Sequence, residues 1–344
     1  MSTPASRATD GLSLAPLGPG NFGRTVEVAT DARSAEGRLE TLLQSADELP
    51  GALLAADGLL LIRGLNEISV NPSLLVELSR FFGERVEDYR EALLPLNMVH
   101  EDLPEILIVS NAPPVNRAPP PRPDPPLTPS GELPTQFPHR RGWHTDQSYR
   151  RPPPDISLFY AVEPATPGQA QTLYANGTAA YAALPAQTRA RIDSLDGIHC
   201  ALNCERSEQE MRAGHTPRPL EAREQPQRQP LARLHPESGK RALFLCESRQ
   251  MDWYEGPIAG LEPGPEGEGA RLLYELMSHY TDARFVYAHE WQAGDLIIYD
   301  NRSTIHAATW FDADTYERCM WRTTVWGNPG PEYAGEDMSW LRGR

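Results

Sequence analysis

Hydrophobic residues in the first third of the chain fall into short runs that predict a helix, a strand and a second helix. Leucines recur at helical spacing within residues 34–46, and the run GLLLIR at 58–63 predicts a buried strand. Residues 71–83 begin with Asn-Pro, which is typical of a helix start, and end with a glycine that is placed to stop the helix. The chain is therefore expected to open as helix, strand, helix.

Most of the remaining apolar runs are only a few residues long, which is the length of a strand rather than of a helix. Strands are predicted at 105–110, 156–161, 172–174, 231–234, 242–245, 284–291, 295–299 and 320–326. Helical patterns are limited to about 178–192, broken by Pro185, and to an amphipathic stretch at 269–280. Many short strands with few helices outside them indicate a mainly β protein, built as a sandwich or barrel with flanking helices.

Three polar stretches interrupt this pattern. Residues 1–20 are small, contain Pro and Gly and lack periodicity, so we expect a loose N-terminal arm before a single domain at 21–344. Proline is so dense at about 112–138 that neither a helix nor an interior strand can persist there. Loops longer than about 15 residues are usually functional or disordered, so this segment is either a lid or wall of a site or a solvated insertion. Residues 205–230 are expected to form a surface excursion.

Composition and charge narrow the classes of function. The chain has 344 residues and a net charge of −15, which argues against binding to nucleic acid or to an anionic membrane surface. Four cysteines do not make a disulfide framework, and we expect His199, Cys200 and Cys204 to be ordinary buried residues rather than a metal cluster. The N-terminal residues lack the apolar core of a secretory signal, and no window approaches the roughly 18 apolar residues of a membrane span. These features favour the cytoplasm.

One segment carries candidate chemistry. In RRGWHTDQSY, residues 140–149, His144 and Asp146 lie two positions apart, so on an extended backbone both side chains share a face. A third ligand is available from His306, in GDLIIYDNRSTIH. Two histidines and one carboxylate are the ligand set of non-haem Fe(II) oxygenases, which leave the opposite face of the metal open.

Two arginines follow this histidine on a predicted strand. Arg318 and Arg322 lie four positions apart and therefore share a strand face, so both can point toward the metal. A guanidinium in a largely apolar strand needs a partner, and its fork suits a carboxylate. Either a structural ion pair or the carboxylate of a co-substrate satisfies that requirement.

With these motifs in order, the chain resembles the taurine dioxygenase and 2,4-dichlorophenoxyacetate dioxygenase family of Fe(II)- and 2-oxoglutarate-dependent oxygenases. The resemblance covers roughly residues 40–330. It rests on WHTDQSY at 143–149, PATPGQAQTLYAN at 164–176, HPESGKRALF at 235–244, HEWQAGDLIIYDNRSTIHAAT at 289–309 and the arginine pair. The family implies a double-stranded β-helix, or jelly roll, with Fe(II) and 2-oxoglutarate as cofactors.

The resemblance also implies roles for single residues. His144, Asp146 and His306 match the iron ligands. Thr172 and Arg322 match the residues that hold the distal carboxylate of 2-oxoglutarate, with Arg318 close to that end, whereas His235 and Asn301-Arg302 match scaffold positions. The chain departs from the family at Gly168-Gln169, where Gly-Gly is usual, and in its long proline-rich segment.

The implied reaction consumes 2-oxoglutarate and O2, oxidises an unactivated C–H bond of a small molecule and gives succinate and CO2. Hydroxylation is the default outcome, and desaturation or cyclisation start from the same hydrogen abstraction. Because Asp146 is present, halogenation is disfavoured. Two alternatives stay open: a non-catalytic metal-binding jelly roll and an Fe(II) enzyme that uses no 2-oxoglutarate. A homo-oligomer, dimer or tetramer, also stays open.

The substrate is expected to be a carboxylate-bearing metabolite or natural-product intermediate. Arg140 lies four residues before the first iron ligand, on the substrate side in the family, so it is a candidate partner for a substrate anion. A solvated basic turn is the alternative. Asp88, Tyr89 and Asn111 are further substrate-side candidates by approximate register. Because Asp88 stands near the position where sulfonate-specific members carry a histidine, taurine itself is disfavoured.

Overall fold

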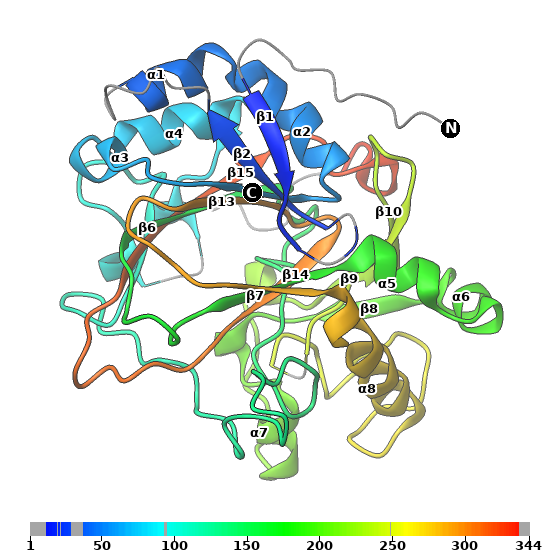
Figure 1. Ribbon diagram of the computed structural model, residues 1–344. Helices are drawn as coiled ribbons and strands as arrows, with labels where there is room; N and C mark the ends of the chain where they lie inside the picture. Colours follow the sequence, from blue (N-terminus) through cyan, green and yellow to red (C-terminus); the bar gives the residue numbers. More distant parts are fainter. Residues whose placement is uncertain are drawn as a thin grey trace.

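The computed structural model describes residues 12–18, 20, 22–28, 37–92, 95–247 and 249–336. Its largest unit is an eight-stranded sheet (Figure 1). Along the sheet the order is β1 (Leu12–Pro16), β2 (Arg24–Val28), β3 (Leu59–Ile62), β13 (Leu296–Asp300), β6 (Ile156–Glu163), β15 (Cys319–Trp326) and β4 (Arg85–Val86), and β5 (Leu107–Ser110) also pairs with β15. Neighbouring strands are antiparallel except β2 and β3.

A smaller, antiparallel sheet packs against the large one. Its order is β12 (Val286–His289), β7 (Thr172–Asn176) and β14 (Thr304–Ala308). In Figure 1 this sheet lies below β6, β13 and β15. The rings of Tyr174 on β7 and Tyr299 on β13 meet between the sheets, with centroids 5.3 Å apart.

The central strands of the large sheet are buried on both faces. Side chains alternate along β13: Ile297 and Tyr299 point toward the smaller sheet, and Leu296 and Ile298 point toward the helices. Strand β3 alternates in the same way. A strand covered on both faces has no polar side, which is why its sequence appears as a continuous apolar run.

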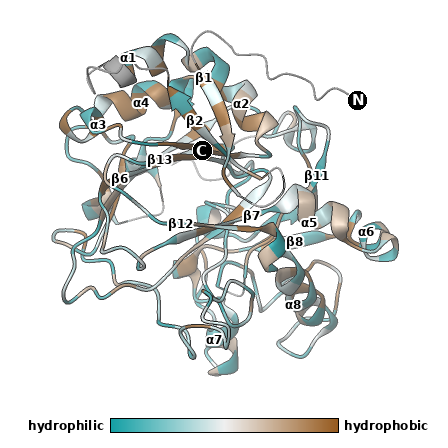
Figure 2. Ribbon diagram, in the orientation of Figure 1, coloured by the Kyte–Doolittle hydropathy of each residue, from teal (hydrophilic) through white to brown (hydrophobic). Residues whose placement is uncertain are grey.

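Helices cover the outside of both sheets. Four pack on the outer face of the large sheet: α1 (Gly37–Gln44), α2 (Leu49–Ala55), α3 (Glu67–Val70) and α4 (Ser73–Arg80). On the other side lie α5 (Gly177–Ala183), α6 (Ala186–Ile192), the short α7 (Glu208–Arg212) and α8 (Glu268–Tyr280). Figure 2 shows apolar residues along β6 and β13 and on α4. Two further two-stranded sheets pair β8 (Asp196–His199) with β9 (Gln227–Pro230), and β10 (Ala232–Leu234) with β11 (Arg241–Leu243).

The architecture confirms a mainly β protein with flanking helices. Each predicted strand is present, although residues 283–285 form a 3-10 turn and β12 starts only at Val286. The helical stretch 178–192 does break at Pro185, and residues 111–143 contain no helix or strand, as their proline content requires. No helix among the described residues is long and apolar enough to cross a bilayer.

The N-terminal arm needs correction. Residues 1–11 of the expected arm lie outside the described residues, but Leu12–Pro16 forms β1 and pairs with β2. Only Leu12 of this strand is buried, so its pattern is too weak to stand out in a Pro- and Gly-containing sequence. Helix α2 was also missed, because it has seven residues and includes Pro50 and Gly51.

Truncation of a core side chain in β3 is expected to destabilise the fold. Leu60 is fully buried between the large sheet and its helices, so Leu60→Ala should lower the free energy of unfolding by about 2–5 kcal/mol. Leu14, which is 42% exposed on β1, provides the matched control, and Leu14→Ala should cost well under half as much. Urea denaturation followed by circular dichroism measures both, and equal losses would contradict this description of the core.

Candidate metal centre and active-site cavity

A backbone bridge brings together two histidines that are far apart in the sequence. The amide N of His144 donates to the carbonyl oxygen of His306 at 2.9 Å, and the amide N of His306 donates back to His144 at 2.8 Å. His306 lies on β14, and His144 lies in the segment that runs beside it. The two imidazole rings are consequently close, with centroids 4.3 Å apart.

Asp146 completes a three-residue cluster. Its Oδ1 lies 3.9 Å from Nε2 of His144 and 4.0 Å from Nε2 of His306. One potential ligand atom from each residue lies within 4.8 Å of the other two, and this is the only such group of three among the described residues. The other carboxylate oxygen, Oδ2, accepts hydrogen bonds from the Tyr299 hydroxyl at 2.6 Å and the Ser157 hydroxyl at 3.2 Å.

The protonation states in the cluster suit a metal. Nδ1 of His144 lies 2.8 Å from the carbonyl oxygen of Gly142, which can only accept, so the proton sits on Nδ1 and the Nε2 lone pair is free. Burial lowers the pKa of His144 and, helped by the neighbouring His144, lowers the pKa of His306 to about 3. Both rings are therefore neutral near pH 7, which metal binding requires.

Asp146 stays ionised although it is buried. Burial opposes its charge, but Arg322 and the two histidines outweigh that effect and hold the pKa of the carboxyl well below its usual value. Nη1 of Arg322 donates directly to Oδ1 of Asp146. Nε of Arg322 reaches the Tyr89 hydroxyl at 3.3 Å, and that hydroxyl is 2.6 Å from Thr324 Oγ1. Arg322 is thus fixed beside the His-Asp-His cluster.

Arg318 has a different environment. The residue is buried, and its Nε and Nη2 atoms have no hydrogen-bond partner among the described residues. Burial lowers the pKa of its guanidinium to about 10. Unpaired donors of a buried cation are costly, so this is a place where an anion would be stabilised.

Thr172 lines the same cavity from β7. Its hydroxyl oxygen accepts a hydrogen bond from Nε1 of Trp291 at 3.0 Å. Because the indole can only donate, the hydroxyl proton of Thr172 remains available to an acceptor in the cavity.

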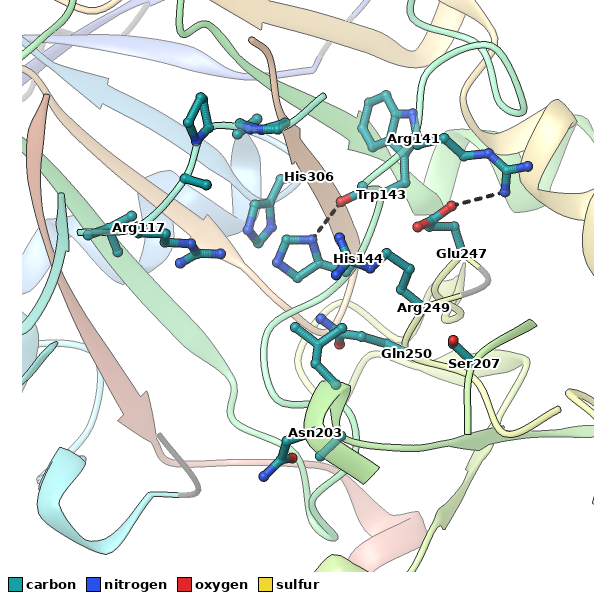
Figure 3. A pocket seen from close by; sticks show the side chains of 18 of the residues that line it. Arg117, Arg141, Trp143, His144, Asn203, Ser207, Glu247, Arg249, Gln250 and His306 are labelled. Atoms are coloured by element: carbon teal, nitrogen blue, oxygen red, sulfur yellow. Dashed lines mark hydrogen bonds and ion pairs between the residues drawn. The ribbon is translucent and has the colours of Figure 1, made fainter. Parts of the chain in front are cut away.

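These residues open into a cavity of about 1440 Å³. Its walls come from β5, β7, β14 and β15, from the proline-rich segment and from residues 201–212 and 247–250. In Figure 3 Arg117 lies on one side of His144 and His306 and Arg249 on the other, while Arg141 extends toward Glu247. Of the proline-rich segment, Val115 and Arg117–Pro121 form part of the cavity wall, and residues 122–138 do not line it.

The predicted substrate residues are placed in different surroundings. Arg140 is buried, its Nε donates to the carbonyl oxygen of Pro134 at 3.0 Å, and it is not among the described residues that line the cavity. Asp88 is not among the described residues that line the cavity, and its carboxylate pairs with Arg90. The Tyr89 hydroxyl contacts Arg322, and Tyr89 is not among the described residues that line the cavity. Asn111 does line the cavity, and its Oδ1 accepts a hydrogen bond from the amide N of Arg318 at 2.7 Å.

Three residues near the metal cluster were not predicted from the sequence. Arg117 lies within the proline-rich segment, and its place after prolines carries no periodic signal. Arg249 follows β11 in a turn, and Tyr299 looked like an ordinary apolar strand residue. The adjacent Arg141 does line the cavity, where Nη1 lies 3.4 Å from Glu247 Oε2.

The scaffold positions behave as the motifs suggested. His235 Nε2 lies 2.9 Å from Asp300 Oδ2, and Arg302 also pairs with Asp300 at 2.7 Å. Asn301 is hydrogen-bonded to the segment between the two ligand candidates His144 and Asp146, because its carbonyl oxygen accepts from Thr145 Oγ1 at 3.1 Å. Cys200 and Cys204 are buried free thiols, as expected.

The fold has two packed sheets, and its cavity is lined by arginines and by the two histidines of a His-Asp-His cluster. This is the type of site found in non-haem metal oxygenases. The chain matches the family described as taurine catabolism dioxygenase TauD, TfdA family over residues 19–324, and it belongs to that family. The resemblance seen in the sequence is thereby confirmed.

Named relatives fit this membership. The chain is 32% identical over 203 residues to a (S)-phenoxypropionate/alpha-ketoglutarate-dioxygenase of Sphingobium herbicidovorans, covering 56% of this chain and 64% of that protein. It is 32% identical over 188 residues to an alpha-ketoglutarate-dependent 2,4-dichlorophenoxyacetate dioxygenase of Cupriavidus pinatubonensis, covering 53% and 59%. The matched region thus spans less than two thirds of the length of these relatives.

A solved structure supports the cofactors. AAD-2 in complex with Mn(II) and N-oxalylglycine aligns with a TM-score of 0.64 and 25% identity, covering 92% of this chain and 97% of that one. N-oxalylglycine has the two carboxylates of 2-oxoglutarate. Together with the family and the His-Asp-His cluster, this agrees with the predicted cofactors, a divalent metal and 2-oxoglutarate.

Removal of the Asp146 carboxylate should strongly weaken metal binding. Asp146→Ala leaves two neutral imidazoles beside Arg322, so we expect Fe(II) affinity to fall by at least about 100-fold. Asp314, an exposed aspartate on the loop after β14, is the matched control, and Asp314→Ala should bind Fe(II) as the parent does. Anaerobic calorimetry measures both, and unchanged affinity in Asp146→Ala would contradict the site.

Proposed function

We propose that the chain is an Fe(II)- and 2-oxoglutarate-dependent dioxygenase that hydroxylates an unactivated C–H bond of a small anionic molecule. We further propose that its two sheets form the double-stranded β-helix of the family. The observation that carries the proposal is the convergence of His144, Asp146 and His306, two of which line a large cavity. Family membership and the names of the relatives support the same reaction class.

In this proposal the metal is held by Nε2 of both histidines and by Oδ1 of Asp146. The protein prepares these atoms in advance: the Gly142 carbonyl sets the tautomer of His144, and Tyr299 and Ser157 occupy Oδ2 of Asp146. When bound, iron and 2-oxoglutarate together activate O2, release succinate and CO2 and supply the oxidant for the C–H bond.

The distal carboxylate of 2-oxoglutarate is assigned to Arg318 and Thr172. Arg318 has buried donors without partners and Thr172 has a free hydroxyl proton, whereas Arg322 already donates to Asp146 and Tyr89. This reverses the emphasis of the sequence comparison, which placed Arg322 at the carboxylate and Arg318 nearby. Arg322 is instead assigned to the space beside the metal.

Spectroscopy separates an oxygenase from a non-catalytic metal-binding jelly roll. Adding 2-oxoglutarate to the anaerobic Fe(II) protein should give a visible charge-transfer band, because the co-substrate then chelates the metal. Aerobic turnover should form succinate, and mass spectrometry of the product should show the gain of one oxygen atom. A protein that binds Fe(II) but gives neither the band nor succinate would contradict the proposal.

The two arginines have separable effects on co-substrate binding. Loss of a charge-assisted interaction costs about 1.5–3 kcal/mol, so Arg318→Ala should raise the dissociation constant of 2-oxoglutarate by roughly 10- to 100-fold, and Arg318→Lys by less. Titration of the charge-transfer band measures the constant. Arg223, a cavity arginine that pairs with Glu221 at 3.0 Å, is the control. An increase confined to Arg322→Ala would overturn the assignment.

A further inference from the structure

The cavity has more positive charge than the proposed cofactors neutralise. Seven arginines line it among the described residues. Three of them have carboxylate partners other than Asp146: Arg141 pairs with Glu247, Arg212 with Glu208 and Arg223 with Glu221. The other four are Arg117, Arg249, Arg318 and Arg322.

The charges of bound cofactors do not remove this excess. Fe(II) and 2-oxoglutarate cancel each other's charge, so four guanidiniums face the single carboxylate of Asp146 in the loaded cavity. Arg322 pairs with that carboxylate, and Arg318 is assigned to 2-oxoglutarate. Arg117 and Arg249 remain, and neither side chain has a hydrogen bond or ion pair to a described residue.

The backbone holds Arg117 beside the metal cluster. The amide N of Arg117 donates to the carbonyl oxygen of Ser110 at 2.9 Å, which ties this part of the proline-rich segment to the end of β5. Its charge acts on both His144 and His306. Burial and the nearby Arg322 lower the pKa of its guanidinium, Asp146 opposes them, and Arg249 lowers the pKa more weakly, so two other arginines act on this guanidinium.

Arg249 is anchored on the opposite wall. The amide N of Glu247 donates to the carbonyl oxygen of Trp143 at 2.9 Å, and the amide N of Gln250 donates to the carbonyl oxygen of Glu247 at 3.2 Å, which ties Glu247 and Gln250 to the chain next to His144. In the view of Figure 3 Arg117 and Arg249 lie on opposite sides of His144, both line the cavity, and the charge of Arg249 acts on Arg117. A site with two convergent, unpaired guanidiniums has the chemistry of a carboxylate, sulfate or phosphate receptor.

We propose that Arg117 and Arg249 together hold an anionic group of the primary substrate in front of the metal. This inference rests on the proposed function. Because the two guanidiniums approach a metal ligand, the oxidised carbon lies within a few bonds of the anionic group. The proline-rich segment thus contributes a specificity residue that the motifs shared with the family do not contain.

The other residues that line the cavity indicate the chemistry of the rest of that substrate. Apolar side chains among its lining residues come from Met98, Val109, Val115, Pro119–Pro121 and Leu202. The cavity of about 1440 Å³ exceeds the roughly 300–1,000 Å³ of most small-molecule sites. A substrate with an anionic group and a sizeable apolar part would contact both the arginines and the apolar side chains. A small, fully polar substrate would leave the apolar side chains without a contact.

Equilibrium binding tests the inference with defined probes. The probes are 2,4-dichlorophenoxyacetate, 2-phenoxypropionate and hexyl sulfate, each paired with a neutral counterpart: the two amides and hexanol. Anaerobic calorimetry on the Fe(II) protein with 2-oxoglutarate should show that at least one anion binds and that its neutral counterpart binds at least about 10-fold more weakly. Equal binding of the members of each pair, or binding of no anion, overturns the inference.

Variants then locate the receptor. Arg117→Ala and Arg249→Ala should each weaken binding of the anion by about 10- to 100-fold, and the lysine variants should recover part of the loss. Arg212→Ala, which removes a paired arginine of the same cavity, is the control and should leave anion binding unchanged. Losses equal to those in the control contradict the inference.

The same variants separate this inference from the proposed function. The dissociation constant of 2-oxoglutarate, read from the charge-transfer band, should be the same in Arg117→Ala, Arg249→Ala and the parent. If the two variants weaken 2-oxoglutarate and not the anion, these arginines belong to the co-substrate and the inference is wrong. If the parent protein gives no band at all, the proposed function fails, while calorimetry still decides whether the two arginines bind an anion.

Discussion

The site depends on the neutralisation of one buried carboxylate. Asp146 lies between two sheets, where an isolated charge is strongly destabilised, yet it is ionised because Arg322, Tyr299 and Ser157 hold its oxygens. A bound divalent cation would further neutralise this carboxylate. The two imidazoles are neutral, so they bind the cation without changing the charge of the site. The arrangement of neighbouring side chains follows from the need to stabilise that charge.

The two-sheet fold supplies this arrangement from distant parts of the sequence. The backbone bridge between residues 144 and 306 joins the metal segment to β14, while β13 and β15 of the large sheet provide Tyr299 and Arg322. Because β13 is buried on both faces, the apolar contacts that stabilise the domain also fix the polar residues on its inner side. Core packing and site geometry are therefore coupled through the same strands.

Periodicity was enough to predict the features that repeat regularly. The apolar runs at 58–63 and 295–299 predicted the central strands, and the two-residue spacing of His144 and Asp146 predicted that their side chains converge. In loops the side-chain directions follow no regular period, so they cannot be predicted in this way. Arg140 and Arg141 are adjacent, and only the fold decides that the first donates to Pro134 while the second faces the cavity. For the same reason the place of Arg117, inside a proline-rich segment, could not be predicted from its neighbours. The roles proposed for Arg318 and Arg322 depend on which guanidinium lacks partners, and only the fold shows this.

An anaerobic crystal structure with Mn(II) and 2-oxoglutarate, with the metal located by anomalous scattering, tests the central claim most directly. The predicted result is a metal bound by His144 Nε2, Asp146 and His306 Nε2, with the distal carboxylate of 2-oxoglutarate on Arg318 and Thr172. A metal bound elsewhere, or a co-substrate carboxylate held by Arg322 with Arg318 still unpaired, would contradict this account.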